Sequence, residues 1–169
     1  MKKIIILAAL IFAAATVAYA QPRAIGGRLG SGLEASYQHN AKGSENFHEI
    51  NLGLAFIGLG VDAVYAYDFM IAQPEWTTKG KWGFYAGPAA NVGYSAWGGL
   101  YYGGYGTVHL GVGGQIGLEY TFDFPLQISL DMRPTLGVRF GSGYVGFYSG
   151  GLWGFIPSLS LRYRFGWKK

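Results

Sequence analysis

Residues 126–140 read LQISLDMRPTLGVRF, and this stretch decides the fold. Apolar and polar side chains alternate along it, with Ile128, Leu130 and Met132 on one face and Asp131 and Arg133 on the other. Alternation with a period of two is typical of a β-strand that has one apolar and one polar face. The run exceeds the roughly 9–11 residues that a tilted strand needs to cross a membrane.

The same alternation recurs along most of the chain. It is found in residues 24–38, 47–56, 59–71, 108–122 and 158–165. The composition agrees, because 29 Gly, 13 Tyr and 11 Phe favour strands over helices, and only 13% of residues are charged against the usual 25% or so. We therefore expect an all-β chain without a spanning helix.

The polar faces indicate which side of the strands is enclosed. In a soluble barrel the apolar face would form the core, and the strands would be about 5–6 residues long. Here the runs are longer, and acids and arginines are nearly balanced, as a narrow lumen of paired charges requires. We expect this lumen network to be structural and to comprise Arg28, Glu34, Glu49, Asp62, Asp68, Glu119, Asp131, Arg133, Arg139, Arg162 and Arg164.

The strand count depends on residues 77–101. Taken as one strand, they give seven strands in all, whereas single-chain bacterial barrels have an even number. A turn at Pro88 repairs the count, because proline cannot donate a ladder hydrogen bond. This gives an eight-stranded antiparallel up-and-down transmembrane β-barrel with strands at 77–87 and 91–101, and a strand around 144–148 is the alternative.

The connections then fall into two sets, one at each end of the barrel. Turns at 56–60, 88–90 and 122–125 form the short set. Connections at 40–45, 73–76, 102–106 and 141–150 form the other, mostly longer set. Short periplasmic turns and long extracellular loops are the rule for outer membrane barrels.

The N-terminus has the layout of a secretory signal peptide. Lys2 and Lys3 precede an apolar run at 4–17, and Ala18-Tyr19-Ala20 supplies a small-x-small cleavage pattern before Gln21. A membrane anchor is the alternative, but its core needs about 20 apolar residues. We expect a signal peptide at 1–20, cleavage between Ala20 and Gln21, and one barrel domain at 21–169.

The second half of the chain resembles the small outer membrane β-barrel proteins of Bacteroidetes bacteria. The resembling pieces are WGFYAGPAANVG at 82–93, GQIGLEY at 114–120, FDFPLQISLDMRP at 122–134 and SLRYRF at 160–165. The resemblance implies an eight-stranded outer membrane barrel of a Gram-negative cell and assigns no catalytic residue. It also implies that the last strand is the signal read by the barrel-assembly machinery, with Tyr163 and either Phe165 or Trp167 as its aromatic residues.

Other candidate sites have alternative explanations. His39, His48 and His109 lack metal-ligand spacing, and the glycines of 111–117 precede no helix that could bind phosphate. The arginines of the last strands could form an anion-selective pore or contact lipid phosphate, or they could belong to a static plug. The aromatic segments 98–105 and 144–148 could bind glycan, protein or lipopolysaccharide, or anchor loops at the interface.

Three functions follow as hypotheses. The first is a non-enzymatic outer membrane protein that stabilises the envelope or contacts surface partners, the second a transport barrel for hydrophobic or anionic solutes, and the third a lipid-modifying enzyme. We find no Ser–His–acid set for the third. We expect no catalytic residue, cofactor or metal, and a monomer that contacts outer membrane lipid, lipopolysaccharide and the assembly machinery but no nucleic acid.

Overall fold

The computed structural model describes residues 21–55, 60–96, 106–141, 144–149 and 155–166. Ten strands account for most of them: β1 (Gln21–Leu29), β2 (Gly32–Asn40), β3 (Phe47–Ala55), β4 (Gly60–Ala72), β5 (Lys81–Ser95), β6 (Thr107–Thr121), β7 (Leu126–Met132), β8 (Thr135–Gly141), β9 (Tyr144–Ser149) and β10 (Ser158–Arg164). Among these residues there is no helix long and apolar enough to cross a membrane.

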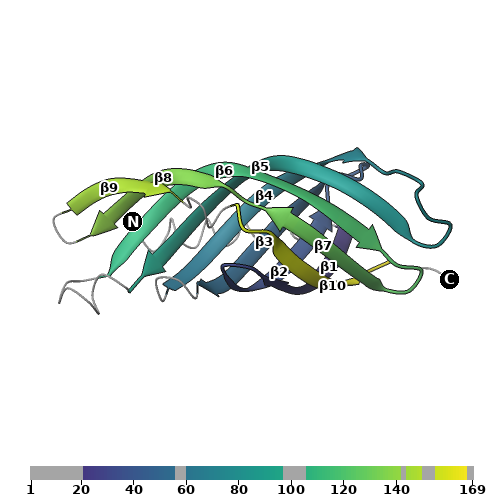
Figure 1. Ribbon diagram of the computed structural model, residues 1–169, viewed down its shortest axis with the longest axis horizontal. Coiled ribbons are helices and arrows are strands. Elements are labelled where there is room, and N and C mark those ends of the chain that lie inside the picture. The colour runs from purple at the N-terminus through teal and green to yellow at the C-terminus, as the bar shows by residue number, and fades with distance from the viewer. Residues whose placement is uncertain (1–20, 56–59, 97–105, 142–143, 150–154, 167–169) are drawn as a thin grey trace.

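The ten strands form a closed, eight-stranded antiparallel barrel (Figure 1). Strands β1 to β6 follow one another around the wall, and β10 closes it by pairing with β1 on one side and β7 on the other. Both β7 and β8 pair with β6 in one continuous register, so they are two halves of one strand interrupted at Arg133 and Pro134. Likewise β9, which pairs with β8, and β10 share the eighth place in the wall.

The structure corrects the position of the extra strand. β5 runs through Pro88, which pairs with Gly114 of β6 and lies where the pairing with β4 lapses between Ala66 and Phe69 without a change of register. The barrel tolerates this proline because only one ladder hydrogen bond is lost there. The turn lies instead at 30–31, so the run at 24–38 is the hairpin β1–β2. The alternative strand at 144–148 exists as β9, but it adds no ninth position.

Moving the turn also corrects the arrangement of the connections. The start of β1 and the end of β10 lie at one end of the barrel, here called the terminal end, together with the connections 41–46, 73–80 and 122–125. At the opposite, distal end lie the turn at 30–31, the end of β3 and start of β4, the end of β5 and start of β6, and the end of β8 and start of β9. The predicted grouping was therefore wrong, because a hairpin at 30–31 reverses the direction of every strand from there to 87.

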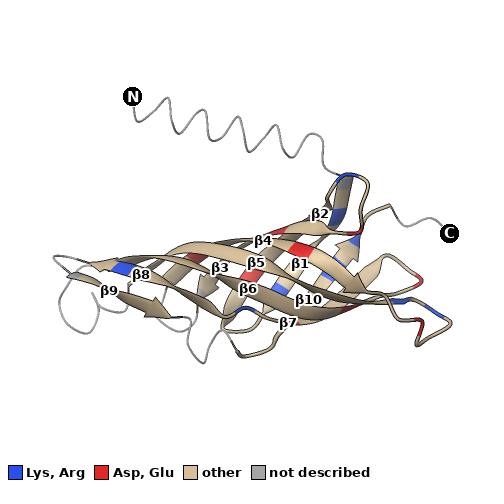
Figure 2. Ribbon diagram, turned by 90° about the horizontal axis from the view of Figure 1, so that it is seen from above, with Lys and Arg blue, Asp and Glu red and all other residues tan. Residues whose placement is uncertain are grey.

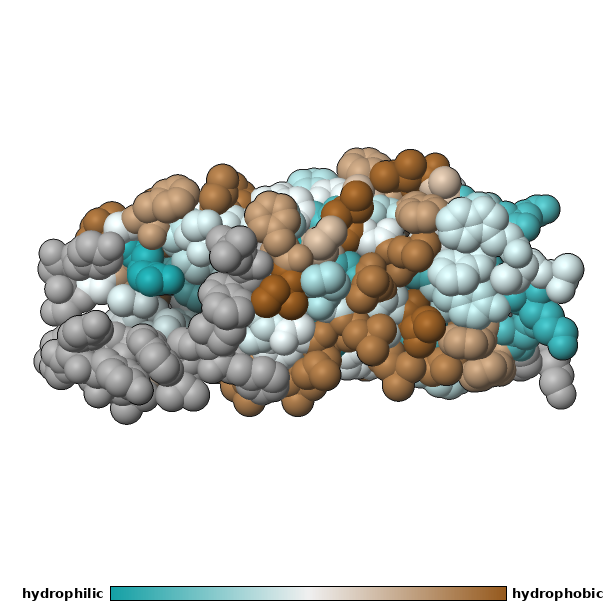
Figure 3. All heavy atoms as spheres, in the orientation of Figure 1, coloured by the Kyte–Doolittle hydropathy of each residue, from teal (hydrophilic) through white to brown (hydrophobic). Residues whose placement is uncertain are grey.

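The apolar face of the strands points outward. Leu130 and Leu161 are 50% and 57% exposed, whereas the neighbouring Asp131 and Arg162 are 1% exposed. Figure 3 shows the resulting apolar surface around the middle of the barrel, and Figure 2 shows charged residues of the strands within the wall. The predicted sidedness is confirmed, since most of the buried side chains are polar or charged.

Glycines make room for large side chains inside this narrow barrel. A Cβ atom on Gly117 of β6 would lie 2.3 Å from Cζ of Tyr85 on β5, and Tyr85 is fully buried. Gly114, also on β6, has only ordinary contacts, with Gly87 O at 3.5 Å from the corresponding position. Gly117 therefore leaves space for a neighbouring aromatic ring.

These two glycines give a matched test of lumen packing. We expect Gly117→Ala to lower the free energy of unfolding by about 1–3 kcal/mol, because Tyr85 has no free space into which to move. Gly114→Ala should change it by less than about 0.5 kcal/mol, as a substitution without a clash does. Urea unfolding followed by tryptophan fluorescence measures both, and equal effects would contradict this account of Gly117.

Candidate functional site

The candidate site is the lumen, where polar side chains from every part of the wall meet. It joins seven of the eleven predicted network residues in direct ion pairs with one another or with an arginine that the sequence analysis missed. These seven are Arg28, Glu34, Glu49, Glu119, Asp131, Arg133 and Arg162. The other four lie on the same face of their strands but outside these pairs.

The missed residue is Arg23, which fills the lumen near the terminal end. Its guanidinium group forms an ion pair with Glu119, donates to Oε1 of Gln38 at 2.8 Å and lies 4.0 Å from the ring centre of Phe47. The register of β1 with β2 shifts between Pro22 and Ala24, and this irregularity turns Arg23 inward although it has the parity of the outward Ile25. Alternation alone therefore assigns Arg23 to the wrong face.

A small charge imbalance in the predicted lumen set could have indicated this residue. The predicted lumen set held six acids and only five arginines, so one cation was missing from an enclosed space where unpaired charge is costly. Arg23 supplies it and is 1% exposed. Phe47 and Tyr85, in edge-to-face contact with ring centres 5.2 Å apart, fill the space beside it.

Glu49 is the centre of the network in the middle of the lumen. Its Oε1 lies 2.9 Å from Arg162 Nη2 and 3.5 Å from Arg133 Nη2. It also accepts hydrogen bonds from the amides of Gln38, at 2.8 Å, and Asn51, at 2.9 Å. This fully buried carboxylate thus joins β2, β3 and β10 to the residue between β7 and β8.

Arg28 and Glu34 extend the network toward the distal end. Arg28 forms ion pairs with Asp131 at 2.6 Å and with Glu34 at 2.9 Å, and Glu34 also reaches Arg133 at 3.3 Å. Each carboxylate is therefore shared or held by a guanidinium group. Such hydrogen bonds between charged groups are stronger than those between neutral groups.

Four predicted network residues remain outside these arginine–acid pairs in the described part of the chain. Asp68 is fully buried, and its only hydrogen bond there comes from Gln115 Nε2 at 3.2 Å. Asp62 lies 3.4 Å from His109 Nε2, and the guanidinium group of Arg139 lies 5.6 Å from the ring centre of Tyr148. The fourth, Arg164, is half-buried at the terminal end.

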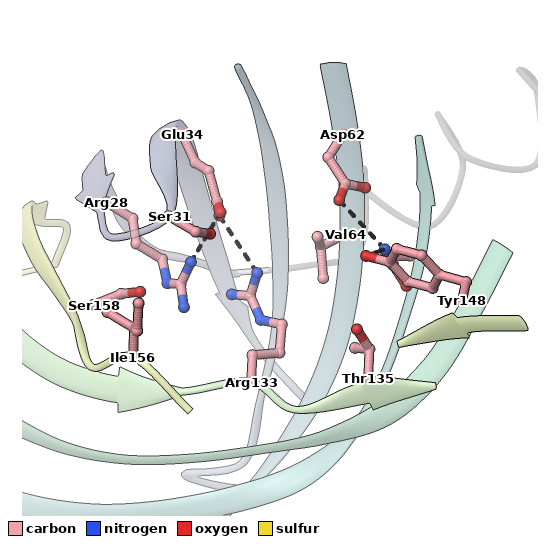
Figure 4. A pocket seen from close by; sticks show the side chains of 11 residues that line it. Arg28, Ser31, Glu34, Asp62, Val64, Arg133, Thr135, Tyr148, Ile156 and Ser158 are labelled. Atoms are coloured by element: carbon pink, nitrogen blue, oxygen red, sulfur yellow. Dashed lines mark hydrogen bonds and ion pairs between the residues drawn. The ribbon is translucent and has the colours of Figure 1, made fainter. Parts of the chain in front are cut away.

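Asp62 borders a cavity that opens the lumen toward the distal end (Figure 4). The cavity has a volume of about 80 Å³, enough for a few water molecules. Polar side chains from both halves of the barrel line it, among them Arg28, Glu34, Asn91 and Tyr148. We call it the distal cup.

The remaining predicted residues lie on the outer wall or outside the described residues. Tyr163 is 53% exposed on β10, and its ring makes an edge contact with Phe165 at 5.4 Å. Gln21 begins β1, whereas Ala20 and Trp167 fall outside the described residues. The signal peptide at 1–20 and the aromatic segment at 98–105 fall largely there as well.

Two histidines lie side by side near the terminal end. His39 and His48 stack with ring centres 4.6 Å apart, and His48 Nδ1 lies 2.6 Å from the hydroxyl group of Tyr65. His109 is separate and stacks on Tyr148 in the lumen. The structure thus distributes the three histidines over two places, and the described residues include no group of three or more potential metal ligands.

Comparisons with family models, curated proteins and solved structures give no match for this chain. The functional argument consequently depends on the geometry of the lumen and the outer wall. Both are defined by the pairing registers and side-chain contacts given above.

Two buried carboxyl groups provide a matched test of the network. Glu49→Gln should lower the free energy of unfolding by about 3–5 kcal/mol, because it leaves Arg162 and Arg133 without the carboxylate they share. Asp68→Asn should cost less than about 1 kcal/mol, because an amide of the same shape replaces a group without an ion pair. Denaturant unfolding of both variants measures this, and equal losses would show that Glu49 is not the centre of the network.

Proposed function

We propose that the protein is an integral outer membrane β-barrel with a non-enzymatic role, stabilising the envelope or presenting a surface to partners. One observation carries the proposal. Of the charged residues within the described strands, only Lys81, the first residue of β5, is exposed. The side chains of the others are buried or half-buried on the lumen side of the wall. A wall that exposes Leu, Ile, Val and aromatic residues but no charge suits hydrocarbon and is unfavourable in water.

The aromatic side chains near the terminal end support a membrane boundary at that level. Aromatic side chains gather on the outer wall near it, namely Tyr67, Phe69, Trp76, Trp82, Phe84, Tyr120, Phe122, Phe124, Tyr163 and Phe165, and many of their rings are in contact. Exposed charged residues, among them Lys42, Glu45 and Lys79, lie beyond this group in the connections. Aromatic girdles at the level of the headgroups have this arrangement in outer membrane barrels.

The filled lumen favours a structural role over transport. Arg23, Phe47 and Tyr85 occupy the terminal half with exposures of 1% or less. An eight-stranded barrel has an interior just wide enough for side chains. The distal cup is the observation that favours the second candidate, passage of small solutes. A lipid-modifying enzyme needs a nucleophile hydrogen-bonded to its base, whereas Nδ1 of His109 has no hydrogen-bond partner among the described residues.

The proposal includes a route to the membrane. A signal peptide at 1–20 would direct export, and the outward Tyr163 and Phe165 of the closing strand would present the aromatic signal to the barrel-assembly machinery. The folded monomer would contact outer membrane lipid and lipopolysaccharide, as the small Bacteroidetes barrels that the sequence resembles are expected to do. Cleavage before Gln21 would leave β1 as the first element of the mature chain.

Two equally exposed residues of one hairpin test the membrane location. Leu130 is 50% exposed at the middle of the wall, and Phe124 is 51% exposed in the turn at the terminal end. In lipid vesicles Leu130→Arg should lower the free energy of unfolding by about 2–4 kcal/mol and Phe124→Arg by about 0–1 kcal/mol, because the cost of a charge depends on its depth. Urea unfolding of the barrel in vesicles measures both.

The same measurement can also contradict the membrane proposal. Equal losses for the two variants, or a mature chain that folds and stays soluble without lipid or detergent, would overturn the membrane proposal. Gel mobility before and after heating reports whether each variant forms the barrel. Only variants that pass this control are compared.

Conductance separates the structural candidate from transport. We expect the purified barrel to give no discrete current steps in a planar bilayer, because the side chains of the terminal half leave no continuous path. The triple variant Arg23→Ala/Phe47→Ala/Tyr85→Ala, which removes the buried groups at that end, should give measurable steps if it folds. Steps from the wild-type barrel would favour the transport candidate instead.

A further inference from the structure

The distal cup has two unlike walls (Figure 4). On one wall Arg28 and Arg133 both form ion pairs with Glu34. Arg28 also pairs with Asp131, and Arg133 also pairs with Glu49. On the other wall stand Asp62 and Tyr148, and Asn91 donates hydrogen bonds to both of them. The first wall is internally compensated, so the second decides what the cup can bind.

Asp62 carries the uncompensated charge of this wall. Its carboxylate has no lysine or arginine within ion-pair distance in the described part of the chain, and its Oδ2 is approached only by Asn91 Nδ2 at 3.3 Å and His109 Nε2 at 3.4 Å. Neither group is a permanent cation. The side chain of Asp62 is 26% exposed, in contrast to 0% for Glu49 and Asp131, so a ligand in the cup can reach it.

The same wall offers hydrogen-bond acceptors rather than donors. Oδ1 of Asp62 and Oδ1 of Asn91 accept no hydrogen bond from any other described residue. The amide of Asn91, a residue only 7% exposed, is oriented by donating Nδ2 to Asp62 and to the hydroxyl oxygen of Tyr148, at 3.3 Å each.

We propose that the distal cup binds a primary ammonium group. An ammonium group has three donors and no acceptor, which matches the acceptors of Asp62, Asn91 and Tyr148 and the negative charge of Asp62. A quaternary ammonium group has no N–H donor and leaves those acceptors unpaired. An anion in the cup would be repelled by the carboxylates of Asp62 and Glu34 at the cup surface. The cup volume of about 80 Å³ restricts the bound part to a few atoms.

Two sources present this chemistry. One is a free small amine such as ethanolamine, and the other is the ethanolamine headgroup of a phospholipid whose acyl chains stay outside the barrel. β9 pairs with β8 on one side, and the described residues place no strand on its other side, so the wall beside Tyr148 is not closed by backbone pairing there. The free-amine case depends only on the fold, whereas the lipid case rests on the proposed membrane location.

Saturation-transfer NMR on the detergent-solubilised barrel tests the free amine. Ethanolamine should give a signal that choline at the same concentration does not. Asp62→Asn should weaken ethanolamine binding by about tenfold or more, since a hydrogen bond to a charged group contributes roughly 1.5–3 kcal/mol. Tyr148→Phe should weaken it about threefold, and Asp68→Asn, which alters a lumen carboxyl group outside the cup, should leave it unchanged.

Native mass spectrometry of the barrel released from nanodiscs tests the lipid source. Phosphatidylethanolamine should remain bound to the wild-type barrel more than phosphatidylcholine with the same acyl chains, and Asp62→Asn should abolish the difference. Retention of the lipid without binding of ethanolamine would assign the site to a headgroup, and the reverse would assign it to a free amine.

Other outcomes overturn the proposal. The first is equal binding of ethanolamine and choline together with equal retention of both lipids. The second is ethanolamine binding that persists in Asp62→Asn. The third is complete competition of ethanolamine by equimolar sodium. Gel mobility before and after heating shows that each variant is folded. A barrel that binds ethanolamine in detergent but fails to insert into vesicles would refute the proposed membrane location and leave the cup intact.

Discussion

The cost of enclosing charge is the constraint on which this structure depends. Twelve charged side chains of the barrel wall face the lumen or its mouth, six of them arginines and six of them acids. Because an unpaired buried ion is far less stable than a paired one, each deep arginine must find a carboxylate across the barrel. Closing of β1 against β10 makes this possible, since Arg28 meets Asp131 and Arg162 meets Glu49 only in the closed form.

The same constraint gives the two halves of the lumen different roles. In the terminal half, aromatic rings and the Arg23–Glu119 pair fill the space, which supports a rigid and non-conducting barrel. In the distal half the packing is incomplete, and Asp62 lacks an arginine partner among the described residues. The other charged residues of the distal cup, Arg28, Glu34 and Arg133, form ion pairs with one another, so Asp62 is left available, and for this reason the proposed ligand site lies there.

The turns show how far periodicity can predict a barrel. Leu29 and Leu33 are partners across the β1–β2 hairpin, and they are four residues apart in the sequence. Partners lie on the same face, so an even separation keeps the alternation in phase and makes the hairpin resemble one long strand. Pro88 led to the opposite error, a turn predicted where the strand continues. The barrel wall accommodates the one ladder hydrogen bond that this proline cannot form. Arg23 was missed because a bulge changes the face of a single residue.

The sequence by itself determined the all-β class, the outward face of each strand and the near balance of enclosed charges. It could do so because the two-residue period of a strand assigns each side chain to one face wherever the chain is regular. Only the tertiary structure decided where the strands end, which way they run and which charges meet. Those features depend on barrel closure, which brings together residues 103 and 113 positions apart in the chain, and no local pattern encodes contacts over such separations.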